Sequence, residues 1–287
     1  MKEKTKGLMI DIAVYAVAFG AAAFPFAYIN GILASSAAFT ACATLVVFAA
    51  STALSDVSVY DPYWSVAPVV IIAACMIKYR VSTVNAWMIF ALVCVWSARL
   101  TVNWYITYKG LRREDWRYAM YRKKYRPALF HLISFAGLHF VPTAVVYAGL
   151  VSALLSMCVP RFSYLSLTGA AVMLASVCLE LVSDLSIHRF LKENSGKKTT
   201  CRVSVWKYSR HPNYLGEMSF WTGLYIYFVC LCPQIWYKGL GFVSVIALFF
   251  AVSIPLMEKH NAARREDYAD YKAKTSLILL LPNKKQR

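Results

Sequence analysis

Residues 206–231 read WKYSRHPNYLGEMSFWTGLYIYFVCL, and the two halves of this stretch have opposite character. The first half carries a cation, an imidazole, an amide, a phenol and a carboxylate, at Arg210, His211, Asn213, Tyr214 and Glu217. The second half is almost wholly apolar, and an apolar run of about 20 residues can cross a bilayer as a helix. Pro212 suits the first position of a helix. The stretch predicts a membrane helix near 214–232 with a dense polar cluster at its mouth.

The composition of the whole chain indicates the same environment. Of its 287 residues, 59% are hydrophobic and 16% are charged, whereas a soluble domain has about 45–50% apolar residues. We therefore expect an all-α fold, a polytopic bundle of about seven or eight transmembrane helices. The candidate spans lie near 8–29, 32–54, 64–79, 84–107, 133–158, 164–189, 214–232 and 239–257. We expect an N-terminal transmembrane hairpin, 1–54, followed by a larger transmembrane domain, 55–287.

The positive charge lies in short blocks between the apolar runs. The net charge is +17, and the cations gather in the N-terminus, in the loops 108–132 and 190–213, and in the tail that begins at Lys259. With eight spans these blocks fall on one side, which the positive-inside rule identifies as the cytoplasm. We therefore expect a bilayer as the partner of the chain, no nucleic acid, and both termini in the cytoplasm. Either a bacterial inner membrane or the endoplasmic reticulum fits this pattern.

The cysteines and histidines do not form a metal motif. The eight cysteines include no CxxC pair, and the five histidines show neither HxxxH nor HExxH spacing. We therefore predict no metal site.

Two groups of carboxylates lie within predicted spans. Glu217 shares a helix face with Asn213 and with Trp221, one turn further on. Glu180 and Asp184 are four residues apart in LELVSDLSIHRF, 179–190. Intramembrane carboxylates are costly and usually face a cavity or a partner. The alternatives are an aromatic belt for Tyr214 and Trp221, and a helix-end pair with Arg189 or the neighbouring basic loop for Glu180 and Asp184.

Two further segments carry candidate residues. The tail MEKHNAARREDYADYKAKTS, 257–276, holds Glu258, Tyr268 and Tyr271. Its basic residues could equally meet anionic lipid. In SVYDPYWSVAP, 58–68, Asp61 lies among aromatic residues and could donate a proton. An ordinary Asp-Pro turn explains Asp61 equally well. Together the polar segments predict a cytosol-facing pocket with cations at its rim, and no GxGxxG motif indicates a Rossmann unit.

The motifs of this chain resemble those of a known family. RHPNYLGE followed by Trp221 and Gly223, with WSARL at 96–100 and EDWRY at 114–118, resembles the steroid 5-alpha-reductase-like membrane proteins, specifically the bacterial-type group DUF1295. The resemblance covers roughly 55–282. It implies a membrane reductase that binds NADPH and reduces a carbon–carbon double bond conjugated to a ketone. The substrate it implies is a lipid-like steroid, sterol or enone.

The resemblance also implies roles for individual residues. Asp61, with Tyr60, matches the catalytic acid segment of the reductases. The residues expected to bind the cofactor are Glu180, Asp184, Arg202, Arg210, His211, Asn213, Tyr214, Glu217, Trp221, Glu258, Tyr268 and Tyr271. Arg210 and His211 would meet the phosphates or the nicotinamide side.

Two positions depart from the family pattern. Trp96 stands where the steroid enzymes have a catalytic tyrosine, and Tyr60 stands where they have a glutamine. An indole can donate a hydrogen bond but cannot give up a proton at neutral pH. Two alternatives to the reductase therefore stay open. One is a methyltransferase of the isoprenylcysteine carboxyl methyltransferase type, which uses S-adenosylmethionine and shares a similar RHxNY stretch. The other is a non-catalytic, lipid-binding membrane protein.

Overall fold

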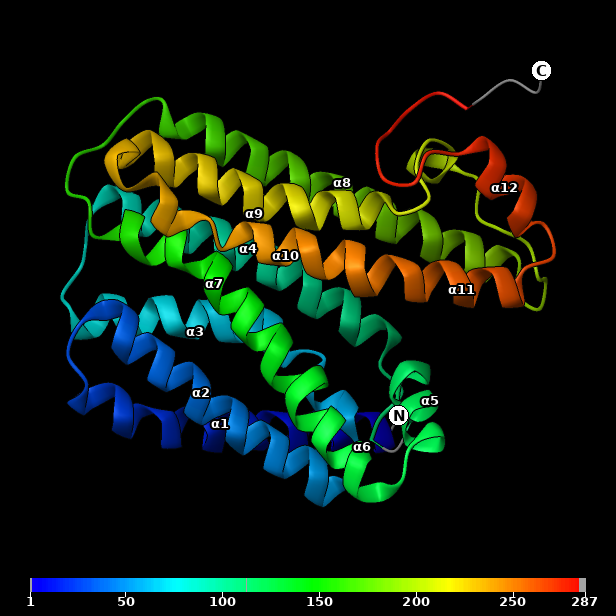
Figure 1. The fold of residues 1–287 in the computed structure, drawn as a ribbon, viewed down its shortest axis with the longest axis horizontal. Coiled ribbons are helices and arrows are strands. Elements are labelled where there is room, and N and C mark those ends of the chain that lie inside the picture. The colour runs from blue at the N-terminus through cyan, green and yellow to red at the C-terminus, as the bar shows by residue number, and fades with distance from the viewer. Residues whose placement is uncertain (1, 112, 284–287) are drawn as a thin grey trace. The chain divides into compact units, whose positions relative to one another are not determined.

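The computed structural model describes residues 2–111 and 113–283. Arg112 of the basic loop and the last four residues of the basic tail lie outside the described residues. The chain divides into two compact units, Met1–Phe162 and Ser163–Arg287, which are described one after the other. The regular elements of the described residues are all helical (Figure 1), which confirms the predicted all-α class.

The first unit consists of helices that pack around α2, α3 and α7. Its elements are α1 (Lys2–Tyr28), α2 (Ile32–Leu54), η1 (Val57–Tyr60), α3 (Tyr63–Lys78), α4 (Val84–Thr107), α5 (Trp116–Lys124), α6 (Pro127–Ile133), η2 (Ser134–Phe140) and α7 (Val141–Met157). The side chains of Thr83 and Asp115 cap the first turns of α4 and α5, because each accepts a hydrogen bond from a backbone N–H at the helix start.

The second unit is a set of long neighbouring helices with a polar C-terminal segment. Its elements are α8 (Ser166–Glu193), η3 (Ser204–Lys207), α9 (Pro212–Leu231), η4 (Pro233–Gly239), α10 (Phe242–Leu248), η5 (Phe249–Ser253), α11 (Ile254–Arg264) and α12 (Tyr268–Lys274). The start of α9 at Pro212 confirms the start expected from the sequence. Both η2 and η5 are π-helical turns within otherwise α-helical rods.

The helices α8 and α9 run antiparallel in close contact along their length (Figure 1). A Cβ atom at Gly169, near the start of α8, would lie 2.4 Å from the backbone nitrogen of Tyr227, near the end of α9. A Cβ atom at Gly223 would likewise lie 2.9 Å from the backbone nitrogen of Met173. Small residues allow two membrane helices to approach backbone to backbone. The two glycines therefore set the spacing of this pair.

Within residues 2–111 and 113–283, seven helical segments are long and apolar enough to cross a membrane: Glu3–Tyr28, Ile32–Leu54, Val57–Lys78, Val84–Thr107, Pro127–Met157, Ser166–Glu193 and Pro233–Arg264. The chain is therefore a polytopic membrane helix bundle, as predicted. The first, third, fifth and last of these segments start earlier than expected. The elements η1, α6 and η4 extend the third, fifth and last segments, respectively. The predicted span at 214–232 forms α9 but is not among the seven, because its first turns carry polar residues such as Asn213 and Glu217.

Candidate functional site

In the second unit, the segment that enters α9 converges on one carboxylate. Glu258, on α11, accepts hydrogen bonds from Arg210, from His211 Nε2 at 2.9 Å and from the Tyr268 hydroxyl at 2.5 Å. Arg210 and His211 are 9% and 3% exposed. We call these four residues the Glu258 cluster. Burial, and then the neighbouring Glu258 carboxylate, raise the pKa of Tyr268, so its hydroxyl stays protonated at neutral pH.

The C-terminal tail fixes the backbone of this segment. The Tyr271 hydroxyl donates to the carbonyl oxygens of Trp206 and Ser209, at 2.6 and 3.0 Å. The Arg210 N–H donates to the carbonyl of Ser276 at 2.9 Å, and the Ser209 hydroxyl donates to that of Ile278 at 2.7 Å. The tail therefore holds Arg210 and His211 where their side chains reach Glu258.

Arg210 keeps one donor that the Glu258 cluster does not use. Its Nε atom is buried and has no hydrogen-bond partner among the described residues, although its Nη1 atom pairs with Glu258. A buried N–H without an acceptor is costly, because the group has lost its water. An acceptor oxygen placed beside Arg210 would relieve this cost.

The carboxylates predicted on α8 and α9 are buried. Glu180 is 0% exposed, and a Cβ atom at Gly216 would lie 2.4 Å from its Cγ atom, so the Glu180 side chain crosses α9 at that glycine. Asp184, one turn further along α8, is 6% exposed. Glu217 is 5% exposed and accepts a hydrogen bond from Trp221 Nε1 at 3.0 Å. The structure therefore places acidic groups in the facing turns of this helix pair.

The other predicted residues of the second unit have definite partners. The Tyr214 ring stacks on that of His211, with centroids 5.1 Å apart and planes 5° apart. Asn213 lies partly exposed in the first turn of α9. Arg202 pairs with Asp270 at 2.8 Å and with Asp267 at 3.2 Å. Arg202 is therefore occupied by two carboxylates.

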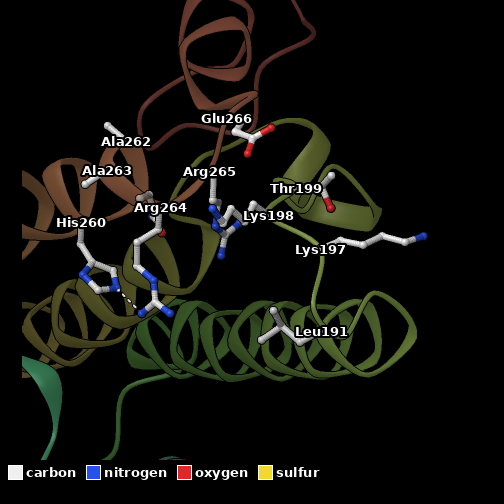
Figure 2. Close-up of a pocket in the computed structure, with 11 residues that line it drawn as sticks. Leu191, Lys197, Lys198, Thr199, His260, Ala262, Ala263, Arg264, Arg265 and Glu266 are labelled. Carbon is white, nitrogen blue, oxygen red and sulfur yellow. Dashed lines mark hydrogen bonds between the residues drawn. The ribbon is translucent and has the colours of Figure 1, made fainter.

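A basic pocket lies beside these residues, at the ends of α8 and α11. It has a volume of about 650 Å³ and is lined by Leu191, Lys197, Lys198, Thr199, His260, Asn261, Ala262, Ala263, Arg264, Arg265 and Glu266. Glu266 N–H donates to the carbonyl of Lys198 at 3.3 Å and so joins the two segments that form its rim. Figure 2 shows Arg264 and Arg265 pointing from the end of α11 toward α8, and Lys197 and Glu266 turned outward.

The charge of the basic pocket suits an anion. It has four permanent cations and one carboxylate, and Arg264 Nη1 lies 3.3 Å from His260 Nε2. None of these lining residues was among the predicted cofactor-binding residues. The sequence signal was nevertheless present, since the pairs Lys197–Lys198 and Arg264–Arg265 follow two spans directly. Nothing in the spacing of the two pairs along the sequence predicts that they line the same pocket.

The predicted acid lies in the first unit. Asp61 follows η1, is partly buried, and accepts a hydrogen bond from the Tyr118 hydroxyl at 2.6 Å. Tyr60 is 3% exposed, and its hydroxyl bonds to Thr143 Oγ1 at 2.8 Å. Trp96 is 0% exposed and packs against Trp64. Tyr60 and Trp96 are therefore core residues, whereas Asp61 is held by a residue that the sequence did not single out for this role.

No group of three or more His, Cys, Asp or Glu side chains that could hold a metal ion occurs in the described part of the chain.

Comparison with known proteins identifies the family of this chain. The model of the family described as "Protein of unknown function (DUF1295)" matches residues 47–275. No curated protein and no solved structure matches the chain. The matched segment contains the Glu258 cluster, the buried carboxylates, the basic pocket and Asp61. The chain belongs to the DUF1295 family.

Proposed function

We propose that this protein is an NADPH-dependent membrane reductase that acts on a carbon–carbon double bond conjugated to the ketone of a lipid-like substrate. The main support is the basic pocket of the second unit. It offers four cations in about 650 Å³, and its lining includes His260, on the same helix as Glu258 and two residues further on. A dinucleotide with several phosphate charges requires such a region, because phosphate groups are held by clustered Lys and Arg side chains.

The ion pairs of the second unit also determine which of its cations are available to bind a phosphate group. Arg202 and Arg210 are paired with carboxylates of the same unit. Among the residues that the structure describes, Lys198, Arg264 and Arg265 of the basic pocket form no ion pair with a carboxylate. We therefore assign the phosphates to the basic pocket. Arg210 Nε and the Glu217 carboxylate would meet uncharged polar parts of the cofactor, such as its carboxamide or ribose hydroxyls.

The cofactor would supply the hydride, and the protein would supply position and a proton. The Glu217 carboxylate is buried and is held by a hydrogen bond from Trp221. Because such a group needs little rearrangement when a ligand binds, the entropic cost of binding is lower. S-Adenosylmethionine carries a positive charge at its sulfonium, so a pocket of four cations favours a phosphorylated cofactor over it.

The basic blocks suggest an orientation in the membrane. Seven spans alone would place the two termini on opposite sides. The close antiparallel packing of α9 along α8 supports α9 as an eighth crossing, because its polar turns are covered by its neighbour. Both termini and the basic pocket would then face the cytoplasm.

Thermal unfolding of the detergent-purified protein with NADPH, NADH and S-adenosylmethionine in parallel tests this proposal. A ligand at about 100 times its dissociation constant adds roughly 2.7 kcal/mol to the stability. We expect stabilisation by NADPH that is lost in Arg265→Glu. The matched control is Lys207→Glu, which makes the same charge change at an exposed cation outside the basic pocket. Stabilisation by S-adenosylmethionine alone would establish a methyltransferase, and no response in folded protein would indicate a non-catalytic role.

A further inference from the structure

In the second unit, the chain after α12 returns to the apolar part of the helices. Residues 276–283 follow α12 without helical structure, and we call them the return segment. Its residue Ile278 is buried in a cluster with Met218 of α9 and Ile254 of α11, and Phe249 packs against the same cluster. Ile254 and Phe249 belong to the candidate membrane span Pro233–Arg264. The return segment therefore reaches residues that lie at membrane depth.

Three leucines of the return segment are left uncovered by the described residues. Leu279, Leu280 and Leu281 are 56%, 42% and 49% exposed, and they form a continuous apolar strip directly after the buried Ile278. We call these three residues the leucine strip. Scattered apolar residues are ordinary on a protein surface, whereas a contiguous exposed apolar patch marks an interaction site. The leucine strip is therefore a candidate contact surface for an apolar partner.

The surroundings of the leucine strip favour a bilayer as that partner. Leu281 N–H donates to the carbonyl oxygen of Tyr208 at 3.3 Å, which places the strip beside Lys207 and Tyr208, both exposed. Tyrosine is enriched at membrane–water interfaces, and lysine near the surface attracts anionic lipid headgroups. The sequence continues past the strip with Lys284 and Lys285. Cations and a tyrosine around leucines at membrane depth suit phospholipid, with its anionic headgroup and apolar chains.

The backbone of the return segment limits how deep it can lie. A non-helical backbone does not enter the hydrocarbon core, because its N–H and C=O groups would lose their hydrogen bonds. Some of these groups are paired within the unit, since the Ile278 carbonyl accepts the Ser209 hydroxyl at 2.7 Å and Leu281 N–H binds Tyr208. The segment therefore fits the boundary between headgroups and acyl chains, where leucine side chains can enter the apolar region while the backbone stays outside.

The return segment also supports part of the Glu258 cluster. Arg210 N–H donates to the Ser276 carbonyl at 2.9 Å, and Ser209, one residue earlier, is bonded to Ile278. These bonds keep the Arg210 backbone where its side chain reaches Glu258. Whatever holds the leucine strip in place therefore also supports Arg210.

We propose that the leucine strip is a lipid anchor. It inserts among phospholipid acyl chains at the headgroup boundary, and the bilayer thereby holds the return segment against Arg210. The inference goes beyond the proposed function and does not depend on it, because none of its contacts involves a cofactor. It makes the geometry of the Glu258 cluster depend on the lipid around the protein.

Photo-crosslinking identifies what covers the leucine strip. The full-length protein is placed in nanodiscs of phosphatidylcholine and phosphatidylglycerol, with p-benzoylphenylalanine in place of Leu280, and mass spectrometry identifies the molecule captured on illumination. We expect phospholipid adducts. The matched control carries the same probe in place of Ala273, which is exposed on the polar helix α12, and it should capture severalfold less lipid. Capture of a second copy of the chain at position 280, or no more lipid than at position 273, would overturn the anchor.

Hydrogen exchange in the same nanodiscs tests the link to Arg210. Peptide mass spectrometry follows the peptide that contains the Arg210 N–H, which becomes free to exchange when the return segment detaches. Leu279→Ser, Leu280→Ser and Leu281→Ser together should speed this exchange about tenfold or more, because burial of a single leucine changes an equilibrium by that much. Exchange in α8 should stay unchanged. Valine at the same three positions keeps the strip apolar and should leave the exchange near the wild-type rate. Wild-type exchange in the serine variant, or equal acceleration in the valine variant, would overturn the link.

Discussion

The indole of Trp221 donates a hydrogen bond to the carboxylate of Glu217, 3.0 Å away and one turn earlier on α9. Both side chains are at least nine-tenths buried. A carboxylate held in this way is fixed in position before any ligand arrives.

The charge of Glu217 can be removed without breaking this contact. Glu217→Gln keeps an amide oxygen for the indole, so we expect the stability to change by less than about 1 kcal/mol. Because the neutral amide accepts hydrogen bonds more weakly than the carboxylate, NADPH affinity should fall about tenfold or more. Titration calorimetry on the purified protein measures the affinity, and thermal unfolding measures the fold. Unchanged NADPH affinity in the folded variant would remove Glu217 from the proposed site.

A side chain added at a glycine between α8 and α9 should destabilise the protein. Gly169→Ala places a methyl group 2.4 Å from the Tyr227 nitrogen, and overpacking costs typically about 1–3 kcal/mol. We expect a lower Tm in detergent. The control is Gly20→Ala on α1, where a Cβ atom has nothing within 4 Å and where alanine favours the helix. If both variants had the same Tm, the close approach of α8 and α9 would be disproved.

The Arg210–Glu258 pair should show strong coupling. Glu258→Gln leaves the Arg210 cation buried without its anion, and breaking a buried pair in this way costs about 3–5 kcal/mol. Because the Glu258 side chain is 13% exposed, we expect a loss near 3 kcal/mol, at the low end of that range. Adding Arg210→Gln should recover part of this loss, since the second change removes the unpaired charge. Chemical denaturation of the four proteins of the cycle measures the coupling, and purely additive losses would contradict the pairing.

The acid dependence of stability should include a small contribution from Asp270. Its pKa lies below its ordinary value of 3.8, first because of Lys274 and then because of Arg202. A lowered pKa stabilises the folded state above pH 3.8, and this contribution disappears as the pH falls through the folded pKa. We expect Asp270→Asn to have a slightly lower Tm than the wild type at pH 6, and the difference to shrink as the pH falls below 3.8 and through the folded pKa. A difference that stayed constant over this acid range would show that it does not arise from ionisation.

Much of the fold is encoded locally, and the sequence reveals it. The apolar runs predict the spans, and Pro212 predicts where α9 begins. The carboxylates at 180, 184 and 217 are recognisable because few residues of that type occur inside apolar runs. Each of these inferences uses residues within one or two helical turns.

The partners of the site residues are not local, and the sequence does not reveal them. Arg210 meets Glu258 across 48 residues, and Tyr118 meets Asp61 across 57. Both contacts depend on how distant helices pack, which no spacing rule specifies. The basic pocket has the same origin, because the segments that carry its two basic pairs are joined by long-range contacts such as the backbone hydrogen bond from Glu266 to Lys198.

The π-helical turn at Phe249–Ser253 has a consequence for insertions and deletions. A π turn contains one residue more than the α-helical turn that could replace it. Loss of one residue inside 249–253 would therefore relax this turn to a regular α-helix and leave Glu258 facing Arg210. The α-helical turns of α11 contain no extra residue. Loss of one residue from α11 before Glu258 would therefore rotate Glu258 about 100° around the helix axis. The surplus residue thus makes this stretch a site where the chain can lose one residue while Glu258 keeps its rotational position on the helix.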